Sequence, residues 1–140
     1  MARREYDRLI LSPSAAVSAL KTANLVLPGS CATGLWHITV SAEDYTGQSQ
    51  SPWDFWLSRD DSRTLTIRAR QSGDQLTLAG RPTKSVKKWL IDEKIPRFRR
   101  DQLPVLVREE QVVAVAGLGP SADCLPSPGT KAWHITVRSL

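Results

Sequence analysis

The stretch TLTIRARQSGDQLTLAGRPTKSVKKWLIDEKIPRFRR, residues 64–100, contains a strand pattern followed by a helix pattern and so decides the fold class. At its start Leu65, Ile67 and Ala69 alternate with polar residues, which predicts a half-buried strand. A turn and then a short strand are expected over 72–78, because small and turn-forming residues precede a brief apolar pattern.

A helix is predicted over about 84–94. Thr83 can cap its first turn, and Pro96 disfavours helical geometry at the residue before it. The same Pro96 predicts a second short helical turn that continues through Gln102. The main helix is amphipathic, since its apolar side chains and its lysines fall in opposite arcs at about 100° per residue. The apolar arc holds Val86, Trp89 and Leu90, and the basic arc holds Lys84, Lys87, Lys88 and Lys94.

Short strands dominate the rest of the chain. Alternating or β-branched patterns predict strands at 36–40, 53–57, 105–107, 112–115 and 133–137. Further segments are a strand-like 6–11, a helix-like 14–22, a short apolar run at 25–27, and polar connections at 41–51 and 120–129. We therefore expect an α+β fold, a strand-rich, sandwich-like domain with one clear amphipathic helix. Within it, a strand-rich N-terminal portion, 1–61, packs on the same unit as a second module, 62–140.

One pentapeptide, Trp-His-Ile-Thr-Val, occurs twice, at 36–40 and at 133–137. Five residues are too few to establish a duplication, so two explanations stay open. In the favoured one, both copies are half-buried strands with the same packing requirements. In the other, they are equivalent strands of two halves. We interpret four tryptophans as core or sheet-face residues and not as base-stacking platforms: Trp36, Trp53, Trp56 and Trp133.

The net charge of +5 is unevenly distributed over the 140 residues. Residues 63–108 carry twelve Lys or Arg and four Asp or Glu, a balance of +8, so the remainder sums to −3. A concentrated basic segment suggests an anionic partner, most commonly nucleic acid, although a solvated face that binds nothing has the same composition. No apolar run approaches the roughly 20 residues that span a bilayer. We expect a cytoplasmic protein with no membrane partner.

The two cysteines are too few for a disulfide framework, and we expect free thiols in a reducing cytosol. Cys31 with His37 and Cys124 with His134 would supply four zinc ligands. Neither pair has the short spacing typical of zinc sites, so we predict no bound metal. No Ser, His and Asp grouping or Cys and His grouping has a recognisable spacing, so no catalytic residue is assigned.

A longer motif runs through the central region. In order, it comprises arginines on a strand, Gly73-Asp74, Gly80-Arg81, Lys84-x-x-Lys87-Lys88, Ile95-Pro96, Arg100-Asp101-x-x-Pro104 and Val115-x-Gly117-Leu118. This order and spacing resemble the C-terminal domain of the tRNA(Ile)-lysidine synthetase (lysidine synthase) family. The segments 4–9 and 25–29 are also similar to that family, though less specific. The resemblance therefore covers most of the chain and is strongest after residue 62.

The resemblance implies that the chain is part of an enzyme that activates the wobble cytidine of an isoleucine tRNA with ATP. The amine of free lysine then attacks the activated base, and lysidine forms. In that family the chemistry belongs to an N-terminal domain with a Ser-Gly-Gly-x-Asp-Ser phosphate loop. Pro28-Gly29-Ser30-Cys31 lacks the second glycine and the aspartate of such a loop. We expect this chain alone to be inactive and to hold no cofactor, with ATP and magnesium serving the parent enzyme.

The expected partners are tRNA(Ile) and the catalytic N-terminal domain, and a homodimer also remains open. Ten cations are the predicted contacts to RNA phosphates: Arg68, Arg70, Arg81, Lys84, Lys87, Lys88, Lys94, Arg97, Arg99 and Arg100. Such contacts position a protein on an RNA stem without reading bases. Arg99 has the alternative of pairing with Asp101. For the whole chain, the alternative is a protein-interaction or dimerisation module with an incidental basic face. An independent enzyme is the function we favour least.

Overall fold

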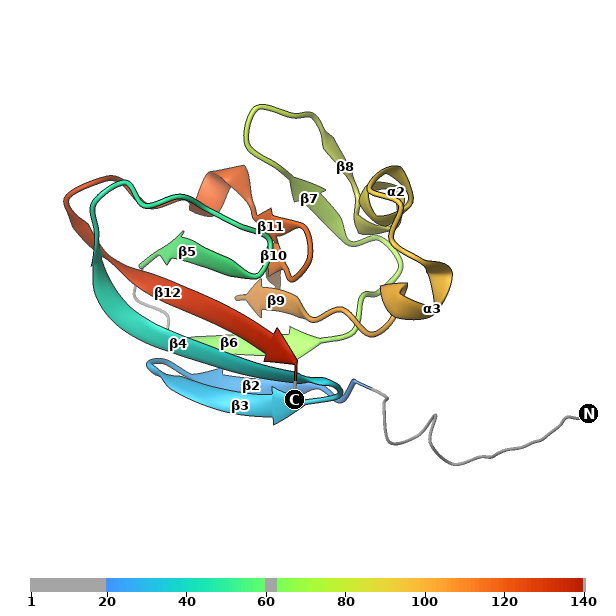
Figure 1. Ribbon diagram of the computed structural model, residues 1–140, viewed down its shortest axis with the longest axis horizontal. Coiled ribbons are helices and arrows are strands. Elements are labelled where there is room, and N and C mark those ends of the chain that lie inside the picture. Colours follow the sequence, from blue (N-terminus) through green and yellow to red (C-terminus); the bar gives the residue numbers. More distant parts are fainter. Residues whose placement is uncertain (1–19, 60–62, 140) are drawn as a thin grey trace, which may run out of the picture.

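The computed structural model describes residues 20–59 and 63–139 (Figure 1). The predictions for 6–11 and for most of 14–22, and the similarity at 4–9, lie outside the described residues. The helices are α2 (Val86–Asp92), α3 (Arg97–Arg100) and the 3-10 helix η1 (Ala122–Cys124). The strands are β2 (Ala23–Val26), β3 (Gly29–Thr33), β4 (Trp36–Tyr45), β5 (Asp54–Ser58), β6 (Thr64–Arg68), β7 (Gln75–Thr77), β8 (Thr83–Ser85), β9 (Val105–Arg108), β10 (Gln111–Val115), β11 (Gly119–Pro120) and β12 (Thr130–Ser139).

The strands form a five-stranded sheet in the order β11-β10-β9-β6-β2, a four-stranded sheet in the order β3-β4-β12-β5, and the hairpin β7-β8. Both larger sheets contribute to one hydrophobic core, in which Ile38 and Ile135 of one sheet and Leu65 and Leu106 of the other are fully buried. The strand-rich α+β prediction is confirmed. The sandwich-like stacking of the sheets and the division between 1–61 and 62–140 stay predictions.

The pentapeptide copies lie in neighbouring strands, since β4 and β12 pair antiparallel along their whole length. In each copy the Trp, Ile and Val are buried, while the His and Thr point away from the core. The shared packing requirement is therefore confirmed. This pairing also corrects one prediction: residues 41–45 were expected in a polar connection but form the second half of β4, because β12 pairs antiparallel with all of β4 and supplies its ladder of hydrogen bonds.

The four tryptophans are core or sheet-face residues, as predicted. Trp133 and Trp56 are buried, and Trp36 stacks on the half-buried Trp53 with ring centroids 4.9 Å apart. Trp36 also donates a 2.6 Å hydrogen bond from its indole nitrogen to the Gln102 carbonyl. The buried rings thus fasten the four-stranded sheet to the segment that follows α3.

Helix α2 begins two residues later than predicted. Residues 83–85 form β8 and pair with β7, so Thr83 faces Thr77 in a hairpin and does not cap the helix. The cap is Ser85, whose hydroxyl accepts a hydrogen bond of 3.0 Å from the Lys88 backbone N–H. Lys84 is consequently a strand residue, and the predicted arc of four lysines on one helix is wrong.

The far end of α2 has the geometry of a Schellman motif. Lys94 lies in the left-handed region with φ 60°, and its N–H bonds the Ile91 carbonyl, while the Ile95 N–H bonds the Leu90 carbonyl at 2.9 Å. Pro96 then starts the short helix α3, which confirms the second helical turn. The motif makes the chain reverse sharply, so α3 is held close to the end of α2.

No helix within 20–59 and 63–139 is both long enough and apolar enough to cross a membrane. Cys31 is half-buried, Cys124 is buried, and neither forms a disulfide. Burial raises the pKa of the Cys31 thiol. Among the described residues, no three His, Cys, Asp or Glu side chains gather as metal ligands.

Candidate nucleic-acid interface

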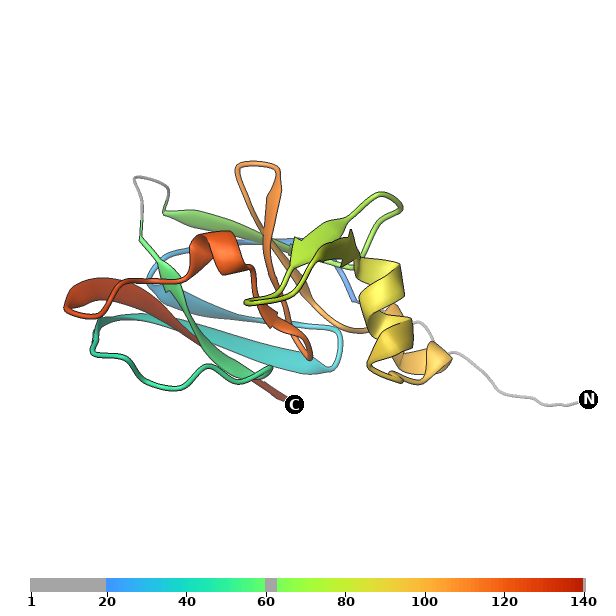
Figure 2. The same ribbon diagram turned by 90° about the horizontal axis from the view of Figure 1, so that it is seen from above.

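Helices α2 and α3 and the β7-β8 hairpin lie together at one end of the molecule, which both views show (Figure 1 and Figure 2). The inner face of α2 buries Val86, Trp89 and Leu90, as the apolar arc predicts. Trp89 is fully buried and donates a 2.7 Å hydrogen bond to the Leu76 carbonyl of β7. The helix is therefore anchored to the hairpin, with its opposite side facing solvent.

Arg68 is bound inside the protein. Its guanidinium donates two hydrogen bonds, of 2.8 and 2.9 Å, to the carboxylate of Asp74, and both side chains are largely buried. Burial acts to raise the pKa of Asp74, but hydrogen bonds from Arg68 and from the Gln71 backbone N–H outweigh it and hold that pKa below its usual value. The pair closes the turn at Gly73, whose φ of 93° favours glycine.

Asp92 binds two of the predicted lysines. Lys84 donates a 2.7 Å hydrogen bond to the Asp92 carboxylate, and the Lys88 ammonium lies 3.1 Å from the same carboxylate. The two lysines hold the pKa of Asp92 below its usual value. The Lys84 ammonium also lies 4.3 Å from the centroid of the Trp89 ring. Much of the positive charge of these lysines is compensated on the helix itself.

Three further arginines have partners nearby. The Arg81 guanidinium lies 4.6 Å from the Trp89 ring centroid and 3.6 Å from Glu93. Arg70 Nε is 3.0 Å from the Asp101 carboxylate without hydrogen-bond geometry, so this contact is purely electrostatic. Arg100 donates a 2.9 Å hydrogen bond to the Ile95 carbonyl. Asp101, which sequence reasoning offered to Arg99, is thus the partner of Arg70.

Four of the ten predicted cations stand apart from these pairs. Lys87, Lys94, Arg97 and Arg99 are all exposed, and none has a carboxylate partner within the part of the chain that the structure describes. The Schellman motif at Lys94 and the proline-started helix α3 place Lys94, Arg97 and Arg99 along one reversal of the chain, while Lys87 lies in the first turn of α2. We call these four residues the unpaired cations. Their charge is available to an external anion.

A cleft of about 390 Å³ opens next to Lys87, between the turn at Gly73 and the start of α2. Two of the predicted cations, one unpaired, and two serine hydroxyls line it. The lining residues are Arg70, Gln71, Ser72, Gly73, Asp74, Ser85 and Lys87. The acid among them is already compensated by Arg68, so the cleft offers cations and hydroxyl donors of the kind that contact nucleic-acid phosphates.

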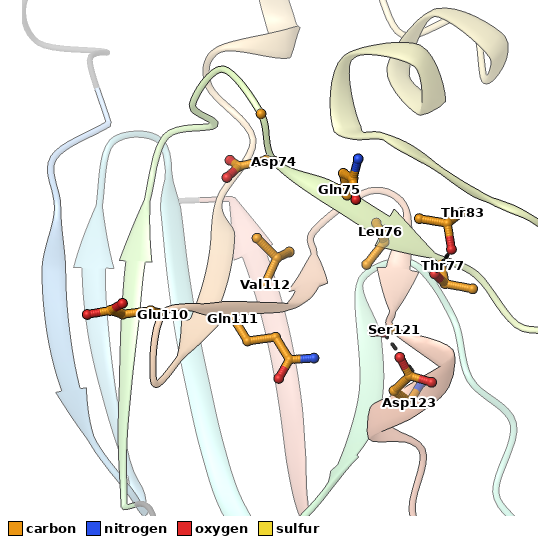
Figure 3. Close-up of a pocket in the computed structure, with 11 residues that line it drawn as sticks. Asp74, Gln75, Leu76, Thr77, Thr83, Glu110, Gln111, Val112, Ser121 and Asp123 are labelled. Atoms are coloured by element: carbon orange, nitrogen blue, oxygen red, sulfur yellow. Dashed lines mark hydrogen bonds between the residues drawn. The ribbon is translucent and has the colours of Figure 1, made fainter.

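A second cleft, of about 330 Å³, lies on the other side of the same turn, with β7 along one wall and β10 and η1 along the other (Figure 3). It contains none of the ten predicted cations. Besides Asp74, which Arg68 compensates, two carboxylates line it, those of Glu110 and Asp123. Because like charges repel, this cleft does not suit a phosphate.

Sequence reasoning missed an exposed aromatic ring within the basic segment. Phe98 lies between Arg97 and Arg99 on α3, and it is 75% exposed, more than the other large apolar side chains that the structure describes. The signal was present in the sequence as an aromatic residue inside the run Arg-Phe-Arg-Arg.

A different ionisable cluster lies on the four-stranded sheet, away from α2 and α3 along the chain. His134 of β12 stacks on Trp56 of β5 with ring centroids 4.2 Å apart. Its Nδ1 is 3.1 Å from the Glu43 carboxylate, and its Nε2 contacts the Asp54 carboxylate. Burial acts to lower the pKa of His134, but the hydrogen bonds to Asp54 and Glu43 outweigh it, so that pKa is raised.

This cluster predicts a pH dependence of stability. Because the pKa of His134 is above its ordinary 6.5 in the folded state, its contribution is complete below pH 6.5 and is lost as the pH rises through the folded value. We expect the parent to lose up to about 1 kcal/mol of unfolding free energy between pH 6 and 8, relative to His134→Gln, after allowance for solvent screening. Urea unfolding of both proteins at the two pH values measures this. A parent-to-variant difference that stays constant or grows with pH would contradict it.

Comparisons with known proteins agree with the central motif. The family model described as "TilS substrate C-terminal domain" matches residues 65–137. A tRNA(Ile)-lysidine synthase of Symbiobacterium thermophilum is 36% identical over 121 residues, which are 81% of this chain and 25% of that protein. One of Staphylococcus aureus (strain COL) is 43% identical over 76 residues, 54% of this chain and 16% of that protein.

Among solved structures, one described as "Crystal structure of TILS C-terminal domain" is similar with a TM-score of 0.70 and 26% sequence identity. The similarity covers 86% of this chain and 98% of that chain. This chain spans a quarter or less of the length of the two curated relatives above. The similarity is therefore to one domain of those proteins.

Proposed function

Because the chain belongs to the family of the TilS substrate C-terminal domain, we propose that it is the tRNA-recognition part of a tRNA(Ile)-lysidine synthase. The parent enzyme would convert the wobble cytidine of tRNA(Ile) to lysidine with ATP, magnesium and lysine in the cytoplasm. This chain would contribute binding and no catalysis. Its partners would be tRNA(Ile) and the catalytic N-terminal domain of the parent enzyme.

The observation that carries this proposal is the group of unpaired cations. Six of the ten predicted cations already have a carboxylate, carbonyl or aromatic partner within the protein, and Lys87, Lys94, Arg97 and Arg99 do not. They lie on and between α2 and α3, at one end of the molecule, and Lys87 lines a cleft together with Arg70. A phosphate backbone is the anion that matches several separated cations, because each phosphate neutralises one of them and releases its counterions.

The contacts would position the RNA and would not read its sequence. Lysine and arginine side chains on a short helix and on the turn before it reach phosphates from outside a stem. The compensated residues Arg68 and Lys84 would keep the hairpin and α2 in place, so that the unpaired cations present a fixed spacing. Shape recognition of a stem fits this arrangement.

Removal of two unpaired cations at a time should weaken binding of the chain to tRNA(Ile) and reduce its salt dependence. We expect Arg97→Gln with Arg99→Gln, and separately Lys87→Gln with Lys94→Asn, to lower the slope of log Kd against log salt by about two units each. Asn is chosen for Lys94 because it tolerates the left-handed backbone. Filter binding or fluorescence anisotropy over a salt series measures the slope.

The matched control is Arg63→Gln with Lys131→Gln. It removes the same charge from the starts of β6 and β12, at the end of the molecule opposite to α3 (Figure 1). Arg63 and Lys131 are exposed, and the contact of Lys131 with Asp44 at 3.2 Å is an exposed ion pair that contributes little, so their loss should leave the fold intact. The control should keep the parent's slope. If control and test variants change the slope equally, only the net charge matters and the proposed interface is wrong.

The same salt titration distinguishes the proposed tRNA-binding function from the alternative, a protein-interaction or dimerisation module. A largely apolar interface depends weakly on salt, whereas electrostatic RNA binding weakens steeply. A parent chain that does not bind tRNA(Ile) at low salt would contradict the proposal as a whole.

A further inference from the structure

We infer that Phe98 is a stacking platform for an unpaired nucleobase of the bound RNA. The inference rests on the proposed function and adds to it a contact of a different kind, because stacking involves a base and not a phosphate. The observation behind it is the 75% exposure of a Phe side chain on α3, directly between two unpaired cations.

The surroundings of Phe98 favour a base over an apolar protein surface. Arg97 and Arg99 are the sequence neighbours of Phe98 on α3, and Lys94 precedes α3, so three uncompensated positive charges lie in the same short segment as one exposed apolar side chain. A protein that covered the ring with an apolar surface would have to desolvate these cations, which is costly without acidic partners. A nucleotide meets both requirements at once, since its base covers the ring and its phosphates neutralise the cations.

The local structure gives the ring a defined place. The Schellman motif and Pro96 fix the direction in which the chain leaves α2, and Arg100 fastens the end of α3 through its hydrogen bond to the Ile95 carbonyl. In both views α3 lies at the outer edge of the molecule (Figure 1 and Figure 2). A ring held at an edge can reach a base that is unpaired, but it cannot enter the stacked interior of a duplex without opening it.

Three substitutions distinguish a stacking contact from a merely apolar one. We expect Phe98→Ala to weaken binding to a tRNA(Ile) transcript about 5- to 100-fold with an unchanged salt slope, since no charge is lost. Phe98→Leu should weaken it nearly as much, because Leu is apolar but has no ring face. Phe98→Trp should keep the affinity of the parent within about twofold.

Two controls complete the experiment. Val26→Ala shortens another exposed apolar side chain, 68% exposed on β2, and should leave binding within about twofold. Long blunt RNA duplex is the second ligand, and Phe98→Ala should bind it as the parent does, because a duplex offers almost no unpaired base. Thermal unfolding of each variant should match the parent, since the side chain is exposed.

The outcomes separate this inference from the proposed function. If Phe98→Ala or Phe98→Leu binds tRNA(Ile) as tightly as the parent while the Arg97 and Arg99 variant does not, the stacking inference is wrong and the phosphate interface stands. Equal losses on tRNA and on duplex would likewise overturn stacking on an unpaired base. If the parent chain binds no RNA, both proposals fail together.

Discussion

Trp89→Ala should destabilise the domain by about 3–5 kcal/mol, the range expected when a buried aromatic side chain is removed from a core. The ring is fully buried between α2 and the β7-β8 hairpin. Its loss also leaves the Leu76 carbonyl without its donor, and it removes the surface on which Arg81 and Lys84 rest. Chemical unfolding followed by circular dichroism measures the change in unfolding free energy.

Two companion variants test this explanation. Trp89→Phe keeps an aromatic ring but loses the N–H donor, so it should cost less than the alanine variant, about 1–3 kcal/mol. Ile91→Ala on the same helix changes a side chain that is 42% exposed and should cost less than about 1 kcal/mol. An alanine variant at position 89 with the stability of the parent would show that the ring does not anchor the helix. Any tRNA binding lost by Trp89→Ala should return under conditions that refold it.

Asp74→Ala should have the second largest effect, a loss of about 2–4 kcal/mol. The substitution leaves the largely buried Arg68 guanidinium without its carboxylate and the Gln71 backbone N–H without an acceptor. Because the pKa of Asp74 is lowered, its stabilising contribution is present above the ordinary value of 3.8 and is lost as the pH falls through the folded value. Urea unfolding at pH 7 and near pH 3 measures both the loss and its pH dependence.

A double-mutant cycle isolates the pair. Arg68→Met with Asp74→Ala removes both charges, and it should recover part of the stability that Asp74→Ala loses, because no unpaired charge stays buried. If the double variant is as unstable as the sum of the single variants, the two side chains do not interact. Binding of tRNA by the folded double variant should be close to that of the parent, since Arg68 is compensated inside the protein.

The sequence predicted those helices and strands whose conformation is determined by their own local residue pattern. The alternation at Leu65 and Ile67 gave β6, and Pro96 correctly ended the main helix before itself. The start of α2 could not be read in this way, because it depends on pairing between β8 and β7, which a helix-forming composition does not reveal. Strand β3 was missed for a related reason: the small residues of Gly29–Thr33 carry no apolar alternation, and β4 determines their conformation.

The candidate interface was predicted in composition but not in detail. The sequence supplied the ten candidate cations. Only the structure shows that the carboxylates of Asp74, Asp92 and Asp101 compensate four of them, which are Arg68, Arg70, Lys84 and Lys88. One pairing was visible in advance, since Lys88 and Asp92 are four residues apart on a helix. The Lys84 contact with the same carboxylate was not, because it crosses from a strand to a helix. The charge pattern therefore indicates the candidate surface, while the geometry shows which of its cations have no partner within the described part of the chain.

The position of β12 has a consequence for how the molecule is made. This strand lies between β4 and β5, so the four-stranded sheet has no continuous hydrogen bonding until the residues of β12 are present. Contacts of His134 with Glu43 and Asp54 span 91 and 80 residues of sequence. During synthesis on the ribosome, the backbone N–H and C=O groups of β4 and β5 that pair with β12 stay without those partners until residues 59–129 have been translated. A nascent chain that stalls before β12 emerges would expose those strand edges to chaperones and proteases.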